Sequence, residues 1–144
     1  MDRLTIVKVG GKVVEEPELL DRLLDAFTTI TGYKILVHGG GKAATDLAAR
    51  LGVETKMVDG RRITDLETLE IVTMVYGGLI NKRVVAGLQA RNCNALGLTG
   101  ADLDLVRARK RAVTDIDYGY AGDVENVNSR ELRIILGENV IPVV

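Results

Sequence analysis

Short apolar runs of the chain end in glycines, where a bound anion could approach the backbone closely. Gly10-Gly11 follows the run 4–9, and Gly39-Gly40-Gly41 follows the run 33–38. Glycine has no Cβ atom, and the first N–H groups of a following helix carry partial positive charge. A single glycine is often needed at such a turn for steric reasons alone. A double and a triple glycine in consecutive units favour a cradle for a phosphate or carboxylate, and Gly100 closes a third run in the same way.

The standard nucleotide-binding motifs do not fit these glycines. Leu36 stands where a P-loop needs its first glycine, and Ala43 replaces the serine or threonine that would bind magnesium. The dinucleotide spacing fails as well, because Ala44 stands in place of the third glycine. The sequence therefore predicts an anion site of another kind.

Lys8 interrupts the first apolar run two residues before its glycines. A buried ammonium group costs several kcal/mol of desolvation unless it meets an anion. We therefore expect Lys8 to point into the cradle and to balance charge on a transferred phosphoryl group. The alternatives are a lysine at a sheet edge whose amine reaches solvent, or one that pairs with a structural carboxylate.

Arg62 is the second candidate for charge recognition. A guanidinium can bind a substrate α-carboxylate through two parallel hydrogen bonds, a geometry that lysine cannot copy. Surface exposure of both Arg61 and Arg62 is the alternative. His38 is the single histidine and could act as a base, but an imidazole hydrogen-bonded to backbone is the preferred interpretation. Asn81-Lys82 is interpreted as a surface or interface pair.

Segments of helical spacing alternate with the apolar runs that carry these residues. Pro17 suits the first turn of a helix that Gly32 ends. A long helix starts at a capping box, Thr64-Asp65-Leu66-Glu67, and is predicted to continue towards Leu88. This alternation predicts βαβ units in a three-layer αβα sandwich with a mostly parallel sheet. Ligands of such sheets bind beyond the carboxyl ends of the strands. The other predicted elements are a helix over 44–51, a β-hairpin insertion over 103–127, a helix over 129–136 and a core strand over 140–144.

Composition excludes several other classes of protein. A chain of 144 residues fits one domain, and a net charge of −1 gives no field to attract nucleic acid or anionic lipid. No apolar run approaches the ~20 residues of a membrane helix, and the start at Met1 lacks the layout of a signal peptide. With one His and one Cys, neither a zinc cluster nor an internal disulfide is expected. We expect a cytoplasmic protein with no nucleic-acid or membrane partner and no metal ligands of its own.

Three segments, taken together, resemble the amino acid kinase family. They are Ile6-Val7-Lys8-Val9-Gly10-Gly11, Val37-His38-Gly39-Gly40-Gly41 and Gly60-Arg61-Arg62-Ile63-Thr64. The likeness covers essentially the whole chain in order, including 81–82, 97–102 and 119–124. Within the family it is closest to the members that phosphorylate N-acetyl-L-glutamate in arginine biosynthesis.

The resemblance implies a transfer of the ATP γ-phosphoryl group, with Mg²⁺, to the side-chain carboxylate of an N-acyl-L-glutamate. Lys8 would stabilise the transition state, and the N–H groups of Gly10, Gly11 and Gly40 would contact the phosphoryl group. Gly40 and Gly41 would also hold the acylated amino acid, with Arg62 on its α-carboxylate. A carboxylate nucleophile needs positioning and charge neutralisation rather than a base.

Members of the family carry a second lobe of similar size with the ATP site, whereas this chain stops at Val144. We expect residues 1–144 to be the acyl-amino-acid-binding amino-terminal lobe, inactive alone because the nucleotide-binding lobe is absent from this chain. Family dimers form through this lobe, so a homodimer is expected. The start at Met1, without an extra helix, favours insensitivity to arginine.

Two alternatives stay open. The chain could be a non-catalytic fragment that dimerises or binds substrate. It could also belong to a related kinase that acts on N-succinylglutamate, an aminoadipate derivative, aspartate, carbamate or a nucleotide. The carboxylate clamp expected at Arg62 favours an acylated α-amino acid, but it does not separate acetyl from succinyl.

Overall fold

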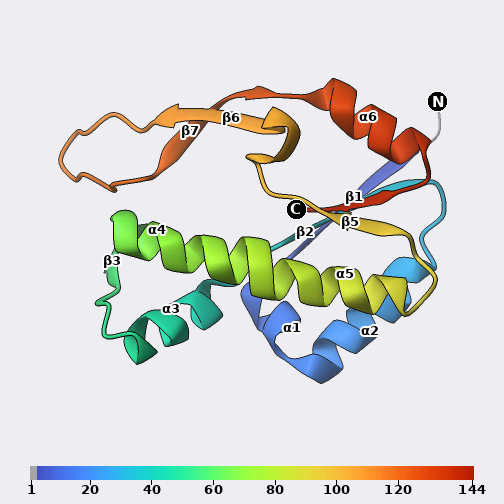
Figure 1. Cartoon of the computed structure of the whole chain (residues 1–144), viewed down its shortest axis with the longest axis horizontal. Coiled ribbons are helices and arrows are strands. Elements are labelled where there is room, and N and C mark those ends of the chain that lie inside the picture. Colours follow the sequence, from blue (N-terminus) through green and yellow to red (C-terminus); the bar gives the residue numbers. More distant parts are fainter. Residues whose placement is uncertain (1–2) are drawn as a thin grey trace.

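A parallel sheet of four strands forms the centre of the computed structural model, which describes residues 3–144 (Figure 1). Met1 and Asp2, where the sequence analysis considered the start of the chain, lie outside the described residues. The strand order is β1-β2-β8-β5, and every ladder is parallel. The carboxyl ends of all four strands therefore meet at one edge. The strands are β1 (Leu4–Val9), β2 (Tyr33–His38), β5 (Ala95–Gly97) and β8 (Ile141–Val143).

Helices cover both faces of this sheet, which confirms the predicted α/β sandwich. The apolar faces of the helices from α1 to α5 pack on one face and share a core with Val9, Leu36 and Val143. Helix α6 packs against β8 on the other side, as Figure 1 shows. The helices are α1 (Gly11–Glu15), α2 (Pro17–Thr28), α3 (Gly41–Arg50), α4 (Leu66–Val72), α5 (Asn81–Gln89) and α6 (Ser129–Gly137), with a short 3₁₀ turn η2 (Asp102–Asp104).

A π-helical segment, η1 (Thr73–Ile80), joins α4 and α5 into one continuous helix. The sequence analysis predicted this long helix but not its wide turns. Such π turns are rare in proteins, and those that occur are often found at functional sites. Here the segment passes the carboxyl edge of the sheet and buries Val75 and Ile80.

The continuous helix 66–89 is long and apolar enough to cross a membrane by length and composition alone. No such segment was expected from the sequence, because no uninterrupted apolar run approaches that length. One helix of this kind is weak evidence for a membrane span, because the core helix of a water-soluble domain meets the same criteria. The buried side chains of this one belong to the core cluster: Ile71, Val75, Ile80, Val84 and Leu88.

Two antiparallel hairpins extend from the sheet. The predicted insertion is confirmed as β6 (Val106–Lys110) and β7 (Gly122–Val127). A smaller hairpin, β3 (Lys56–Val58) and β4 (Arg61–Ile63), was not predicted. Its turn residues Asp59 and Gly60 have φ of 49° and 74°, as a two-residue type I′ turn requires.

Asp65, rather than Thr64, caps the long helix. Its carboxylate accepts a hydrogen bond of 2.8 Å from the Thr68 N–H, which satisfies one of the unpaired donors of the first turn. Thr64 instead pairs with the 112–121 loop, since its N–H donates to Tyr118 O and its carbonyl accepts from the Tyr120 N–H. The predicted capping box was therefore displaced by one residue.

Lys34 closes the carboxyl end of α2 from inside the protein. Its side chain is buried, and Nζ donates to the carbonyls of Phe27, Thr28 and Ile30 at 3.0, 3.1 and 3.0 Å. Lys34→Met would remove these three hydrogen bonds from the inside of the protein, so we expect a loss of about 2–3 kcal/mol in the free energy of unfolding. Urea denaturation of the Lys34→Met and unsubstituted chains measures this difference in the free energy of unfolding.

Lys42→Met is the matched control for this prediction. Lys42 is exposed and pairs only with Asp46, four residues along the same helix, so its replacement is expected to change stability by no more than about 0.5 kcal/mol. Equal stability of the two variants would show that Lys34 does not cap α2.

Candidate functional site

The glycine bends after β1 and β2 touch each other. A Cβ atom on Gly11 would lie 3.4 Å from the amide nitrogens of both Gly40 and Gly41, and one on Gly39 would lie 3.3 Å from Gly11 N. The Gly39 N–H donates to Val9 O at 3.1 Å, which extends the pairing of the two strands into the bends. Neighbouring parallel strands thus bring the two predicted glycine clusters to one point at the carboxyl edge.

Several amide groups of these bends have no hydrogen-bond partner within the described residues 3–144. None of the hydrogen bonds among residues 3–144 uses the N–H of Gly10, Gly11, Gly40 or Gly41. The amide two residues after Gly41 is occupied, because the Ala43 N–H donates to the Glu15 carboxylate at 2.9 Å. A carboxylate of the chain thus already binds at this helix start.

Arg62 lies against the second bend. Its Nη2 donates to Gly41 O at 3.0 Å and to Thr45 Oγ1 at 2.9 Å, and its Nη1 donates to Thr55 Oγ1 at 3.2 Å. The β3–β4 hairpin is thereby fixed on the first turn of α3. A guanidinium has five N–H donors, so Nε–H and the second Nη1–H remain for a ligand.

Lys8 is exposed, which corrects the expectation that its amine is buried. Side chains of β1 alternate, so Lys8 shares a face with the exposed Leu4 and Ile6, while Val7 and Val9 face the core. No hydrogen bond or ion pair among residues 3–144 involves its amine. The desolvation cost that pointed to Lys8 in the sequence does not arise in this chain. Its position two residues before the first bend is as predicted.

The π-helical segment forms the wall opposite the second bend. A Cβ atom on the buried Gly40 would collide with Ile80 Cδ1 and would lie 3.0 Å from Tyr76 Cδ1. One on Gly77 would lie 3.0 Å from Thr99 Cγ2, beyond β5. The wide turns of η1 therefore bring helix backbone and ring edges close to the strand ends.

A pocket of about 190 Å³ lies beside this wall, beyond the ends of β2, β8 and β5. Gly100, the third predicted glycine, lines this pocket and does not take part in the contact between the first two bends. The lining residues are His38, Tyr76, Gly77, Asn81, Leu98, Thr99, Gly100 and Val144.

Asn81 is the site residue that the sequence analysis misplaced. It is 1% exposed, not at the surface, and its Nδ2 donates to His38 Nε2 at 3.2 Å and to Val143 O at 3.0 Å. Its spacing contained the signal, because Asn81 precedes Val84 by three residues and Leu88 by seven, as the buried face of a helix requires. The neighbouring Lys82 is exposed, as predicted.

His38 is bonded to backbone, as preferred from the sequence. Its Nδ1 lies 3.0 Å from the carbonyl oxygen of Gly39. With Nε2 on the Asn81 amide, both ring nitrogens are engaged within the protein. The imidazole therefore serves the structure of the bend rather than acting as a base.

Asp102 completes the polar surface near β5. The Thr99 N–H and hydroxyl donate to its carboxylate at 2.6 and 2.7 Å. These bonds, the backbone one first, hold the pKa of Asp102 below its usual value, with a smaller contribution from the charge of Lys82. Among residues 3–144, no three His, Cys, Asp or Glu side chains are grouped so as to hold a metal ion.

Comparison with known proteins connects this site to a family. The protein-family model described as "Amino acid kinase family" matches residues 3–144. The acetylglutamate kinase of Phocaeicola vulgatus is 61% identical over 142 residues, covering 99% of this chain and 55% of that protein. The acetylglutamate kinase of Methanopyrus kandleri is 43% identical, covering 98% and 56%. The chain thus spans about half the length of the curated relatives it matches.

Solved structures share the fold. The protein smu.665 of Streptococcus mutans superimposes with a TM-score of 0.79 at 25% identity, over 98% of this chain and 57% of that one. An N-acetylglutamate synthase of Neisseria gonorrhoeae, complexed with coenzyme A and N-acetyl-glutamate, gives a TM-score of 0.76 at 22% identity, over 97% and 33%. The second likeness is one of fold alone.

Proposed function

The chain belongs to the amino acid kinase family, and on this basis we propose that its protein phosphorylates the side-chain carboxylate of N-acetyl-L-glutamate with ATP, in arginine biosynthesis. Residues 1–144 are, in this proposal, the lobe that binds the acylated amino acid. The observation that carries it is the contact between the bends 10–11 and 39–41, with Arg62 bonded to Gly41. The choice of N-acetyl-L-glutamate as substrate rests on the relatives that are named acetylglutamate kinase.

Each residue has a defined part in this proposal. The unpaired N–H groups of Gly10, Gly11 and Gly40 bind oxygens of the phosphoryl group in flight. Gly40 and Gly41 hold the substrate, whose α-carboxylate accepts from one of the two unused N–H groups of Arg62. A side-chain carboxylate oxygen bonds to the γ-phosphorus while the bond from phosphorus to the ADP oxygen breaks. No proton moves, so positioning and charge balance, with the Lys8 ammonium as the cation, provide the catalysis.

In this proposal the bends hold the phosphoryl group in transfer, and the chain has no P-loop. Most of the ATP and Mg²⁺ site is assigned to the part of the relatives that this chain does not span. The chain alone is expected to bind acylglutamate without turning it over.

Titration calorimetry on the chain tests the proposal. N-acetyl-L-glutamate is expected to bind, and Arg62→Lys to weaken binding by about tenfold to a hundredfold, because an ammonium group cannot keep the three bonds of the Arg62 guanidinium and bind a carboxylate as well. Arg61→Lys is the matched control, since Arg61 is exposed next to it and is expected to leave affinity unchanged. Equal losses in both variants would contradict the role of Arg62.

The same titrations separate the alternatives. Tighter binding of N-succinyl-L-glutamate would reassign the acyl group, and tight binding of ATP would place the nucleotide site within this chain. If neither amino acid binds and the particle in sedimentation has twice the chain's mass, the chain is a dimerisation module.

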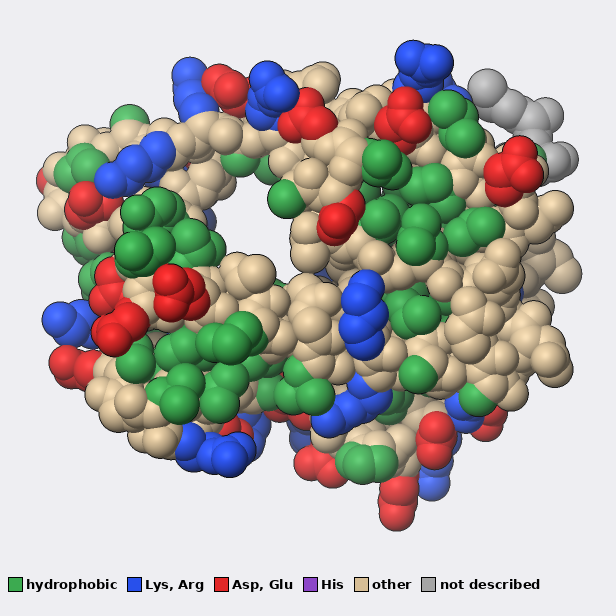
Figure 2. Space-filling model, viewed as in Figure 1, with side chains coloured by type: hydrophobic (Ala, Val, Ile, Leu, Met, Phe, Trp, Pro, Cys, Tyr) green, Lys and Arg blue, Asp and Glu red, His purple; other side chains and the backbone are tan. Residues whose placement is uncertain are grey.

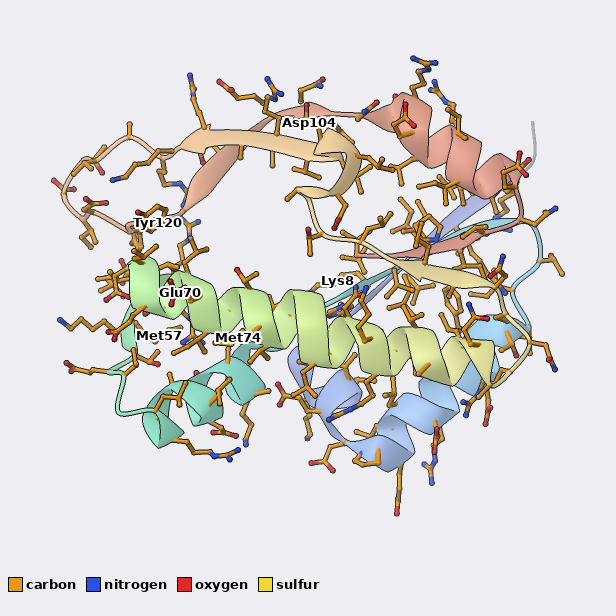
Figure 3. All side chains as sticks on the ribbon, viewed as in Figure 1. Lys8, Met57, Glu70, Met74, Asp104 and Tyr120 are labelled. Carbon is orange, nitrogen blue, oxygen red and sulfur yellow. The ribbon has the colours of Figure 1, made fainter. Side chains whose placement is uncertain are left out.

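One apolar surface favours the pairing of two copies of the chain, whether or not the chain binds an acylated amino acid. Leu66, Met74 and Leu79 are each more than half exposed on the outer side of the α4–η1 helix. Figure 3 labels Met74 and Glu70 on this helix, and Figure 2 shows apolar side chains gathered over it. We propose that a second copy covers this patch to give a homodimer. The proposed setting is the cytoplasm.

A further inference from the structure

We propose that Asn81 is a positioning residue that acts through His38 on the triple-glycine bend. Its amide holds the imidazole as the Nδ1–H tautomer, which holds the Gly39 carbonyl and thereby aims the Gly40 N–H into the cradle. The hydrogen-bond relay stands on geometry alone, whereas its effect on a ligand rests on the proposed function.

The neighbours of Asn81 determine which way its amide faces. Nδ2 lies 3.0 Å from Val143 O and 3.4 Å from Leu98 O, and both carbonyl oxygens can only accept. On the other side, Lys82 Nζ, which can only donate, lies 3.2 Å from Oδ1. The reverse orientation would oppose acceptor to acceptor and donor to donor.

The amide orientation fixes the tautomer of His38. An amide NH₂ group only donates, so His38 Nε2, 3.2 Å away, must accept. In a neutral imidazole the proton is then on Nδ1, which faces Gly39 O at 3.0 Å and donates to it. Every donor in this chain of bonds meets an acceptor.

The tautomer in turn sets the direction of one amide in the cradle. The carbonyl of Gly39 and the N–H of Gly40 belong to one planar trans peptide, so they point in opposite directions. Holding Gly39 O on the imidazole therefore aims the Gly40 N–H away from it. That N–H makes none of the hydrogen bonds among residues 3–144.

The anchor of the relay is rigid. Asn81 is almost completely buried and ties the end of β2 to the ends of β8 and β5 through the three groups that its Nδ2 contacts. Glycine resists a defined conformation more than any other residue. The backbone conformation of the three consecutive glycines therefore depends on contacts with other residues, and the hydrogen bond from His38 to Gly39 O is such a contact.

Nuclear magnetic resonance tests the relay directly, because His38 is the single histidine. Long-range ¹H–¹⁵N correlations of the chain at neutral pH report which ring nitrogen carries the proton. We expect the Nδ1–H tautomer, and a mixture of tautomers in Asn81→Ala. Asn128→Ala is the matched control, since it removes an amide bond to the Leu103 carbonyl outside the relay, and it is expected to leave the signals unchanged. An Nε2–H tautomer in the unsubstituted chain would refute the relay without any variant.

A rescue experiment links the relay to ligand binding. The side-chain NH₂ of His38→Asn can replace Nδ1–H as donor to Gly39 O, whereas His38→Leu cannot. We expect His38→Leu to weaken N-acetylglutamate binding by about tenfold and His38→Asn to recover most of it. Equal losses in both would overturn the positioning role. If the unsubstituted chain binds no acylglutamate, the proposed function fails, and the tautomer still decides whether the relay exists.

Discussion

Replacement of Gly40 by alanine is expected to abolish binding of N-acetylglutamate and to destabilise the fold. The added methyl group would overlap Ile80 Cδ1 and press on the Tyr76 ring. Ile80 is 1% exposed and packed in the core, so the bend must move instead. Overpacking of this kind costs about 1–3 kcal/mol, and displacement of the N–H groups removes the contacts that bind the ligand. Calorimetry is expected to show a loss of at least about a hundredfold in affinity, and urea denaturation measures the stability.

Gly78→Ala is the control for this variant. Gly78 lies in the same π-helical wall, but a Cβ atom there would meet nothing within 4 Å. Alanine is therefore expected to keep affinity and to raise stability by up to about 1 kcal/mol through helix propensity. Affinity of Gly40→Ala within threefold of the unsubstituted chain would rule out close approach of the ligand at this bend.

Replacement of Gly97 by alanine is expected to remove the support of the bend from the other side. A Cβ atom there would overlap Asn81 Oδ1 and lie 2.7 Å from Lys82 Nζ. Asn81 cannot withdraw without breaking its bonds to His38 and Val143. We expect a loss of about 3 kcal/mol in the free energy of unfolding and a change in the His38 nitrogen spectrum. Denaturation and magnetic resonance on one sample measure both.

Gly137→Ala provides the comparison. A Cβ atom at this last residue of α6 would meet nothing within 4 Å, so stability should not fall and the His38 signals should stay unchanged. A Gly97→Ala chain that keeps the unsubstituted His38 spectrum would mean that Asn81 has room to move, contrary to its packing.

The regular part of the fold was predictable because local and tertiary preferences agree. Pro17 opens α2 at the predicted place, and Tyr33–His38 forms the predicted strand before the triple glycine. The meeting of the two glycine bends follows from the parallel order of β1 and β2. Such features depend on periodicity and on where a chain can turn, which the sequence contains directly.

The predictions were wrong where contacts between residues distant in the sequence determine burial and local structure. Lys8 was expected to be buried because its neighbours in sequence are apolar, but it lies on a face of the edge strand β1 that is exposed at Leu4 and Ile6 as well. Asn81 was read as a surface residue because asparagine is polar, yet three strand ends supply the partners that make its burial favourable. The hairpin that carries Arg62 was missed although Asp59-Gly60 is a strong turn signal. Its strands, at three residues each, were too short to show an alternating pattern.

The π-helical segment determines the angular phase of everything that follows it along the helix. In an α-helix each residue advances by about 100°. A one-residue deletion between Thr73 and Ile80 can be taken up by closing a wide turn to an α-helical one, whereas a one-residue insertion would rotate Asn81 off the strand ends and carry Val84 out of the core with it. Point substitutions on the outer side of η1 leave that phase intact. This stretch should therefore tolerate inserted residues far less than it tolerates changes in residue type. The number of residues from Tyr76 to Asn81 sets where Asn81 lies relative to the strand ends.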